Sequence, residues 1–338
     1  MKSIIQFFFS LVGICCITSC NHCTQLVIDS TVFSTKESIY CVTYNAQTFF
    51  DAIEDGREFS EFKGNKTKWS AETYKKRLER LRQVGEISVE TLGGGKNRMP
   101  DIFVIQEIES ERVIEDFAKL FSEGEGYKNA VFFPPTGSGN FSTAIFSKFP
   151  VVSYEQFKLT NTRFSTSGLR PLVKATVEIN LGNTKQHITI FGIHWKSKKG
   201  DNTEVVRKAQ QEQLLKQVKA VFADDKDAYV LICGDFNQQG AEFDPMENLQ
   251  DVWQLEVPTY SFYGIQGSYY YNESWEDIDH IFFSHNLRDG NALELVDFAP
   301  VAVKPLIRDN GRPNEFRLQN GGGYSDHLPL CAVLSFIE

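Results

Sequence analysis

The sequence predicts an α/β (α+β) fold, in which helices pack against mixed sheets. Fully apolar runs such as residues 229–233 are typical of strands that are buried on both faces. Polar stretches with apolar positions at helical spacing, such as residues 203–222, predict helices between these strands. Blocks of both kinds alternate with antiparallel stretches, which is typical of sheets covered by helices.

One domain is expected, because no internal repeat and no low-complexity linker divides the 338 residues. Its first half predicts, in order, a strand at residues 38–44, a long loop at 51–69, a helix at 70–92, a strand at 101–105 and a helix at 110–121. Ser70 is a suitable N-cap for the first helix, and the three glycines at 93–95 end it.

The second half is richer in strands. Apart from one helix at residues 203–222, strands are expected at residues 129–133, 142–147, 150–158, 171–180, 187–194, 229–233, 277–284 and 328–336. The folded domain is therefore expected to occupy residues 38–338.

The N-terminus has the features of an export signal. A short basic start is followed by an apolar stretch and small residues, so residues 1–19 are expected to be a signal peptide. The sequence Ile17-Thr18-Ser19-Cys20 resembles a bacterial lipobox, which would make Cys20 the lipidated first residue and residues 20–37 a tether. We expect an exported protein anchored by lipid in a bacterial cell envelope; the alternative is a soluble secreted protein.

Charge and cysteine content narrow the possible functions. The net charge is −9, and loss of residues 1–19 removes only the charge of Lys2, so a generally basic nucleic-acid coat is excluded. The net charge does not exclude an enzyme with a local basic cleft. Cys41, Cys233 and Cys331 lie in apolar runs and are expected to be buried free thiols, and no spacing suggests a zinc site.

Polar residues lie at the ends of several apolar strands, where α/β proteins build their sites. Each one alone has an ordinary explanation, such as a turn residue or a histidine satisfied at a strand end. The complete set is harder to explain in this way. Its members are Asn45, Glu107, His194, Asp235, Asn237, Asp279, Asp326 and His327.

Six ordered motifs carry a resemblance to a known group. They are Thr43-Tyr44-Asn45, Gln106-Glu107, His194-Trp195-Lys196-Ser197-Lys198, Gly234-Asp235-Phe236-Asn237, Ile278-Asp279-His280 and Ser325-Asp326-His327. Together they resemble the endonuclease/exonuclease/phosphatase superfamily of deoxyribonuclease-I-like enzymes, here as a bacterial lipoprotein member. The resemblance covers residues 38–336. It implies a four-layer sandwich of two mixed β-sheets flanked by helices.

The resemblance and the chemistry of phosphodiesters together imply a metal site. A cation must neutralise charge that grows on the phosphoryl oxygens, and Mg²⁺ prefers oxygen ligands from one or two carboxylates. Glu107 is the expected first ligand, with Asn45 beside it and Asp326 contributing. Mn²⁺ and Ca²⁺ are the alternative ions.

The remaining motif residues are assigned to catalysis. His327 is the candidate general base, oriented by Asp279, and Asp235 either orients the attacking water or is itself the base. Asn237 and His194 are expected to contact the phosphoryl oxygens, and His194 is a candidate donor to the leaving group. His280 is excluded, because side chains alternate along a strand and it should face away from Asp279.

Basic residues near these motifs are candidate substrate contacts: Arg163, Arg170, Lys196 and Lys198. For the lysines a solvated charge run is the alternative. Arg170 is the stronger candidate, because it precedes a core strand and guanidinium groups suit phosphate. The three tyrosines at 269–271 could stack on bases or simply cover the sheet edge.

The leading functional hypothesis is a Mg²⁺-dependent phosphodiesterase, a secreted or surface-anchored nuclease acting on DNA or RNA. The alternative enzyme acts on phospholipid head groups or inositol phosphates, as sphingomyelinases do, because one fold supports many chemistries. A non-catalytic surface lipoprotein is the third hypothesis. The expected partners are nucleic acid and, through Cys20, the membrane; a monomer with no protein partner is expected.

Overall fold

The computed structural model describes residues 38–64, 68–122, 126–181, 184–243, 252–254 and 267–337. All of them belong to one compact unit, Phe33–Glu338. The predicted signal peptide at 1–19, the tether at 20–37 and the lipidation site Cys20 lie outside the described residues. None of the helices described is long and apolar enough to cross a membrane.

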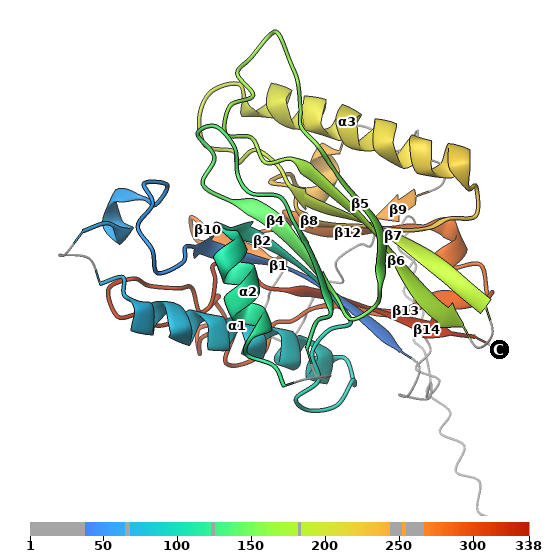
Figure 1. Ribbon diagram of the computed structural model, residues 1–338, viewed down its shortest axis with the longest axis horizontal. Coiled ribbons are helices and arrows are strands. Elements are labelled where there is room, and N and C mark those ends of the chain that lie inside the picture. Colours follow the sequence, from blue (N-terminus) through green and yellow to red (C-terminus); the bar gives the residue numbers. More distant parts are fainter. Residues whose placement is uncertain are drawn as a thin grey trace, which may run out of the picture. The chain divides into compact units, whose positions relative to one another are not determined.

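Two six-stranded sheets form the frame of the described part of the chain (Figure 1). The first sheet has the order β13 (Leu293–Pro300), β14 (Leu330–Phe336), β1 (Ile39–Phe49), β2 (Ile102–Ile108), β4 (Ser142–Ser147) and β3 (Asn129–Phe132). The second has the order β5 (Val151–Phe157), β6 (Leu172–Leu181), β7 (Thr184–His194), β8 (Tyr229–Asp235), β12 (Asp279–Ser284) and β9 (Val252–Gln254).

Each sheet is mixed, with a parallel pair among antiparallel neighbours. The parallel pairs are β1 with β2 in the first sheet and β7 with β8 in the second. A separate hairpin joins β10 (Tyr269–Tyr271) to β11 (Ser274–Glu276). Parallel neighbours bring their carboxyl ends to the same edge of a sheet, so both sheets have an edge suited to a site.

The two sheets pack face to face, and helices cover their outer faces. Alternation along β1 shows this directly, because Cys41 faces a core shared with the second sheet while Tyr40 and Val42 face a different core beneath the helices. Helices α1 (Ala71–Thr91) and α2 (Glu111–Ala118) cover the first sheet, and α3 (Thr203–Asp224) covers the second (Figure 1). The four-layer sandwich is confirmed.

Local signals explain where the elements begin and end. The Ser70 hydroxyl accepts a hydrogen bond from the Thr73 backbone N–H at 3.2 Å, so the predicted N-cap of α1 is confirmed. Gly93 follows α1 with a φ of 83°, a conformation that glycine adopts at little cost. Cys41, Cys233 and Cys331 are buried and free, as predicted.

Several boundaries differ from the prediction. Strand β1 continues to Phe49 and β2 to Ile108, so Asn45 and Glu107 lie within strands near their ends and do not follow them. The α2 helix ends at Ala118 and not at residue 121. Strands β9, β10, β11 and β13 were not predicted; β10 and β11 have only three residues each, too few for a periodic pattern.

The chain enters β14 through a glycine-rich turn that brings Asp326 and His327 to the edge of the sheet. Gly323 has a φ of 86°, and a Cβ atom placed there would lie 1.8 Å from the backbone oxygen of Glu315. No side chain fits at that distance, so close approach of two backbone segments requires glycine here.

Candidate active site

The predicted site residues come from both sheets and meet at one end of the sandwich. Register within the second sheet places Asp235 of β8 beside His194 of β7 and Asp279 of β12. Asn45 of β1 reaches across from the first sheet, and its Nδ2 donates a hydrogen bond to Asp235 Oδ2 at 3.0 Å. The carboxyl ends of the two parallel pairs therefore face one another.

Asn45 links the carboxylates of the two sheets. Its Nδ2 also lies 3.3 Å from Glu107 Oε1, while its Oδ1 accepts a hydrogen bond from the Gln47 backbone N–H at 3.0 Å. The amide nitrogen, and not the oxygen, thus faces Glu107 and Asp235. Oδ1 keeps a second lone pair, so the predicted ligand role of Asn45 remains a prediction.

Glu107 is held in an unusual backbone conformation. Its φ is 64°, a region that non-glycine residues rarely adopt and that concentrates at functional sites. The Thr48 backbone N–H donates to Glu107 Oε2, whereas Asn45 contacts the other oxygen, Oε1. The Glu107 carboxylate is therefore oriented by two donors from the β1 segment.

His194 is buried beside both acidic residues. Its Nε2 lies 3.8 Å from Glu107 Oε1 and 3.7 Å from Asp235 Oδ2, and its Nδ1 has no hydrogen-bond partner among the described residues. Burial, then the positive charges of Arg170 and His327, lower the pKa of His194 well below its usual value. A neutral imidazole can donate one hydrogen bond but does not carry the extra proton that a leaving group needs.

Asp235 has the titration behaviour of a group that can exchange a proton near neutral pH. Burial and the Asp279 carboxylate raise the pKa of Asp235 to about 7, against the lowering effects of His327, Asn237 and Asn45. The Asn237 backbone N–H donates to Asp235 Oδ1 at 2.8 Å, and the Asn237 side chain donates to the Trp195 backbone oxygen at 3.3 Å.

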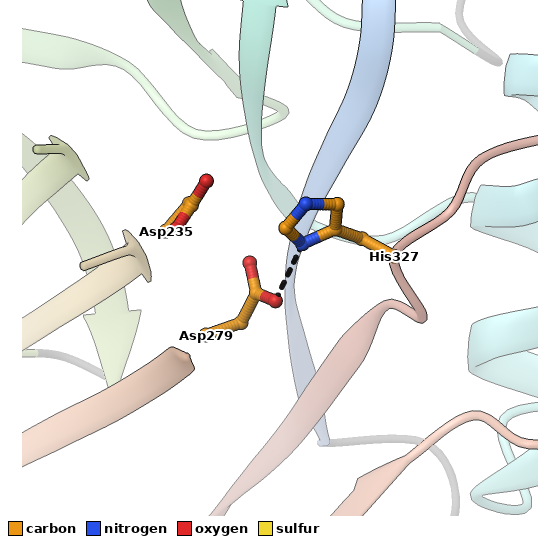
Figure 2. A group of neighbouring side chains, drawn as sticks. All are labelled: Asp235, Asp279 and His327. Atoms are coloured by element: carbon orange, nitrogen blue, oxygen red, sulfur yellow. Dashed lines mark hydrogen bonds and ion pairs between the residues drawn. The ribbon is translucent and has the colours of Figure 1, made fainter. Parts of the chain in front are cut away.

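The Asp279 and His327 side chains form a buried pair (Figure 2). His327 Nδ1 lies 2.8 Å from Asp279 Oδ2, which also accepts a hydrogen bond from Ser268 Oγ at 2.6 Å. Figure 2 shows the two side chains pointing toward one another, with Asp235 beside them on a neighbouring strand. A carboxylate in this position fixes the orientation and tautomer of the ring.

The charge state of His327 bears on its role. Burial opposes the protonated ring, but the carboxylates of Asp279, Asp326 and Asp235 outweigh it and raise the pKa of His327 to about 10. The ring is therefore an imidazolium at neutral pH and donates hydrogen bonds. This charge favours Asp235 over His327 as the general base, the choice that the sequence left open.

Asp326 lies on the Glu107 side of the site. Ser325 Oγ donates to the Asn45 backbone oxygen at 2.7 Å and accepts from the His327 backbone N–H at 3.0 Å, which fixes the turn that carries Asp326. Burial, opposed by His327 and reinforced by the Glu107 carboxylate, raises the pKa of Asp326. A bound cation would remove this unfavourable interaction between two carboxylates, so the donor set fits a divalent metal.

A second group of side chains could also hold an ion, because Asp235, Asp279 and His327 offer ligand atoms that lie within 4.8 Å of one another. In this group His327 Nδ1 is already engaged by Asp279 at 2.8 Å. A protonated ring has no lone pair for a metal. The trio is therefore better suited to holding and moving a proton than to binding an ion.

The predicted exclusion of His280 agrees with the structure. Its Nε2 lies 2.7 Å from the Gln238 backbone oxygen, and its Nδ1 lies 3.8 Å from Asp277. Its ring packs against Phe236 and Phe243, on the outer face of the second sheet. Neighbouring residues of a strand point to opposite faces, which separates His280 from Asp279.

The four predicted substrate contacts differ in their placement. Arg170 interacts electrostatically with Glu107 and Asp235, so it belongs to the site, and burial lowers its pKa. Lys196 is half-buried and interacts with Arg170. Lys198 forms ion pairs with Glu242 and Glu276, both at 3.2 Å, and Arg163 is exposed.

Three further residues support the site, and the sequence assigned none of them a role. Ser268 has no local pattern that distinguishes it from a turn serine, and Ser325 appears only as the first residue of the Ser325-Asp326-His327 motif. Arg77 lies on α1 and is buried, and its guanidinium donates to the backbone oxygens of Ala46, Gln47 and Thr48. It lies between the rings of Phe49 and Phe316, 4.5 Å and 3.9 Å from their centroids.

Arg77 is expected to position the segment that orients Glu107. The Arg77→Lys substitution keeps the charge but loses the planar fork, so Thr48 and Asn45 should hold Glu107 less firmly. We expect activity to fall about 10- to 100-fold, with a higher metal concentration needed for half-maximal rate. Titration of the metal in steady-state assays measures both effects.

Arg82→Lys is the matched control. Arg82 lies on the same helix, is partly exposed, and forms ion pairs with Glu79 and Glu86. It should leave the rate and the metal requirement unchanged. A normal metal requirement in a folded Arg77→Lys variant would contradict the positioning role.

Known proteins match this chain at the level of family and fold. A family model described as "Endonuclease/Exonuclease/phosphatase family" matches residues 40–335. A search of curated proteins found no match.

Solved structures share the fold at low identity. D. rerio TDP2 complexed with single strand DNA product has 14% identity and a TM-score of 0.53, covering 88% of this chain and 99% of that chain. The human Nocturnin catalytic domain with bound sulfate anion has 18% identity and a TM-score of 0.53, covering 89% of this chain and 95% of that chain. Beta toxin from Staphylococcus aureus has 16% identity and a TM-score of 0.55, covering 87% of this chain and 99% of that chain.

At these identities the structural likeness shows the fold alone, while the family model spans nearly the whole described region. Members of this superfamily are phosphoester hydrolases that use divalent metals. The chain belongs to the endonuclease/exonuclease/phosphatase family.

Proposed function

We propose that the protein hydrolyses phosphodiester bonds of DNA or RNA with the help of Mg²⁺. One observation carries the proposal: two carboxylates, Glu107 and Asp326, lie beside a cationic group made of His327 and Arg170. Carboxylates suit a divalent cation, and the cationic groups suit the anionic oxygens of a phosphodiester. The site therefore offers complementary charge to both components of the reaction.

Glu107 and Asp326 would hold the metal, with Asn45 as the third candidate. When bound, the ion supplies positive charge against the phosphoryl oxygen on which negative charge grows. Mn²⁺ and Ca²⁺ are alternative ions for the same oxygen ligands.

The side chains of the protein supply binding and proton transfer. The His327 imidazolium, held by Asp279, and the Arg170 guanidinium bind phosphoryl oxygens, and Asn237 and the neutral His194 donate further hydrogen bonds. As the bond from phosphorus to the leaving oxygen breaks, that oxygen takes up a proton from solvent water; Asp235 accepts the proton of the attacking water as its oxygen bonds to phosphorus. Asp235 is buried, which keeps bulk water from competing for that proton.

Nucleic acid is the favoured substrate for two reasons. Lys196, whose ammonium lies close enough to interact with the Arg170 guanidinium, extends the positive charge beyond the phosphoryl site, as a polyanion requires. The Tyr269 ring lies 4.6 Å from the His327 ring and 6.1 Å from the stacked Tyr271 ring, and Tyr271 is exposed, so a base could stack on it. The D. rerio TDP2 structure contains a single strand DNA product, which agrees with this choice.

The experiment offers the purified chain single- and double-stranded DNA, RNA and sphingomyelin liposomes, each with Mg²⁺ and with EDTA. We expect Mg²⁺-dependent cleavage of nucleic acid and no release of phosphocholine. Phosphocholine release without nucleic-acid cleavage would move the substrate to lipid head groups. No turnover of any phosphoester, in folded protein, would leave only the non-catalytic lipoprotein.

The cellular location is a separate part of the proposal. Export by residues 1–19 and lipidation of Cys20 would place the enzyme at a bacterial cell envelope, with secretion as the alternative. Radiolabelled palmitate should label the wild type and not a Cys20→Ala variant. Equal labelling of both would contradict the anchor.

A further inference from the structure

A second group of carboxylates lies outside the active site, on the loop that follows β1. Its members are Asp55, Glu58 and Glu109, and the three ligand oxygens lie within 4.8 Å of one another. Glu109 follows the end of β2, so the group joins the loop to the frame of the first sheet. Acidic residues often gather on surfaces without an ion, but Glu109 distinguishes this group from such surface clusters.

Glu109 is only 2% exposed, and its two carboxylate oxygens differ. Oε2 accepts a hydrogen bond from the Asp51 backbone N–H at 2.7 Å, whereas Oε1 has no hydrogen-bond partner among the described residues. A buried carboxylate oxygen without a partner is costly, and such atoms are rare in native proteins. The unpartnered carboxylate belongs to the group that faces Asp55 and Glu58, where a cation would satisfy it.

The other two members leave room for an ion. Glu58 is 5% exposed, and its oxygens accept from the backbone N–H groups of Asp55 at 2.7 Å and Gly56 at 3.0 Å. Each oxygen keeps a lone pair for a ligand bond. Asp55 is exposed, so water can complete the coordination from outside.

The charges in the group are not balanced by the side chains around it. Lys63 pairs with Glu58 at 3.8 Å, and Arg112 pairs with the neighbouring Asp51 at 3.2 Å. Asp55 and Glu58 therefore face one ammonium at long range, and burial together with the carboxylates of Asp51, Glu58 and Asp55 raises the pKa of Glu109 to about 8. A divalent cation would remove most of the remaining repulsion.

We propose that Asp55, Glu58 and Glu109 bind Ca²⁺ at a site that is separate from catalysis. Ca²⁺ takes oxygen ligands at about 2.3–2.6 Å, so two ligand oxygens can lie up to about 5 Å apart around it. Mg²⁺ usually keeps several waters and takes only one or two carboxylates, whereas Ca²⁺ accepts several carboxylates in a flexible geometry. Three carboxylates whose ligand oxygens lie within 4.8 Å of one another therefore suit the larger ion.

Bound Ca²⁺ would fix the loop against the end of β2. The same loop carries Phe59 and Phe62, whose rings pack on Phe50 with centroids 5.3 Å and 4.7 Å away. Glu109 lies two residues after Glu107, so the ion would stabilise the strand end that presents the catalytic carboxylate. The expected effect is on stability and not on the chemistry itself.

The test measures thermal unfolding of the full chain, without Mg²⁺, as CaCl₂ is added. At about a hundredfold excess over the dissociation constant, the melting temperature should rise by about 5 °C. The rise should persist in Glu107→Gln, which removes the active-site ligand. It should be lost in Glu58→Gln and in Glu109→Gln, which keep the side-chain shape.

Glu61→Gln is the matched control, because it removes the same charge from the same loop at an exposed position outside the group. It should keep the full response to Ca²⁺. If Glu109→Gln does not fold, Asp55→Asn at the exposed position replaces it, with loss of at least half of the rise expected. No rise in the wild type, a rise that survives Glu58→Gln, or one that disappears with Glu107→Gln alone would overturn the proposal.

Discussion

The Glu107→Gln variant is expected to lose activity by about 10³-fold, with a melting temperature within a few degrees of the wild type. Glutamine keeps the shape of the side chain and can still accept a hydrogen bond from Thr48, so the fold should tolerate it. The lost negative charge weakens the binding of a divalent metal, whose charge stabilises the transition state. Steady-state assays with a phosphodiester at saturating Mg²⁺ measure the loss.

Glu111→Gln provides the control for this variant. Glu111 is an exposed residue four positions along the chain, in the first turn of α2, and the substitution removes the same charge. Its activity should be unchanged. If Glu107→Gln is as active as Glu111→Gln, the metal ligand has been assigned to the wrong residue.

The Asp279→Asn variant is expected to lose activity by about 10³-fold for a different reason. Asparagine cannot stabilise the imidazolium of His327 and can present an N–H to its Nδ1, which favours the wrong tautomer. The pKa of His327 should then fall from about 10 toward its ordinary value. NMR titration of the imidazole C–H signals, assigned with a His327→Gln variant, measures the shift.

The pair of Asp279 and His327 also determines the pH range over which the His327 ring is protonated. Because Asp279 raises the folded-state pKa of His327, the wild-type ring stays protonated up to about pH 10. The variant should lose that proton at a lower pH. Asp277→Asn is the matched control, since its carboxylate faces His280 and not His327. An unshifted His327 signal in Asp279→Asn would contradict the role of the pair.

The sequence was sufficient to predict the layers of the fold and the place of the site. Apolar runs on both faces of a strand are a local signal, and they predict sheets buried between layers. The motif residues lie at the ends of those runs, so they gather wherever the strand ends meet, as Asn45 and Asp235 do across the two sheets. Their catalytic roles stay predictions.

Other features depend on contacts between distant residues, which no local pattern reveals. Ser325 and Asn45 are 280 positions apart, and the hydrogen bond between them exists only in the folded chain. Arg77 has the spacing of a helix residue, and only the folded chain reveals that it is buried and donates to the backbone oxygens of Ala46 and Gln47. The charge of His327 likewise depends on three carboxylates that come from separate strands and turns.

The position of a bound metal distinguishes most sharply between a site at Glu107 and Asp326 and one at Asp235, Asp279 and His327. A crystal of the wild-type chain soaked in Mn²⁺ and inorganic phosphate gives an anomalous signal that locates the ion without reference to activity. We predict the ion within coordination distance of Glu107 and Asp326 oxygens, with phosphate oxygens near His327 and Arg170. An ion bound instead among Asp235, Asp279 and His327, with none at Glu107, would contradict the division of the site into a metal side and a proton-transfer side.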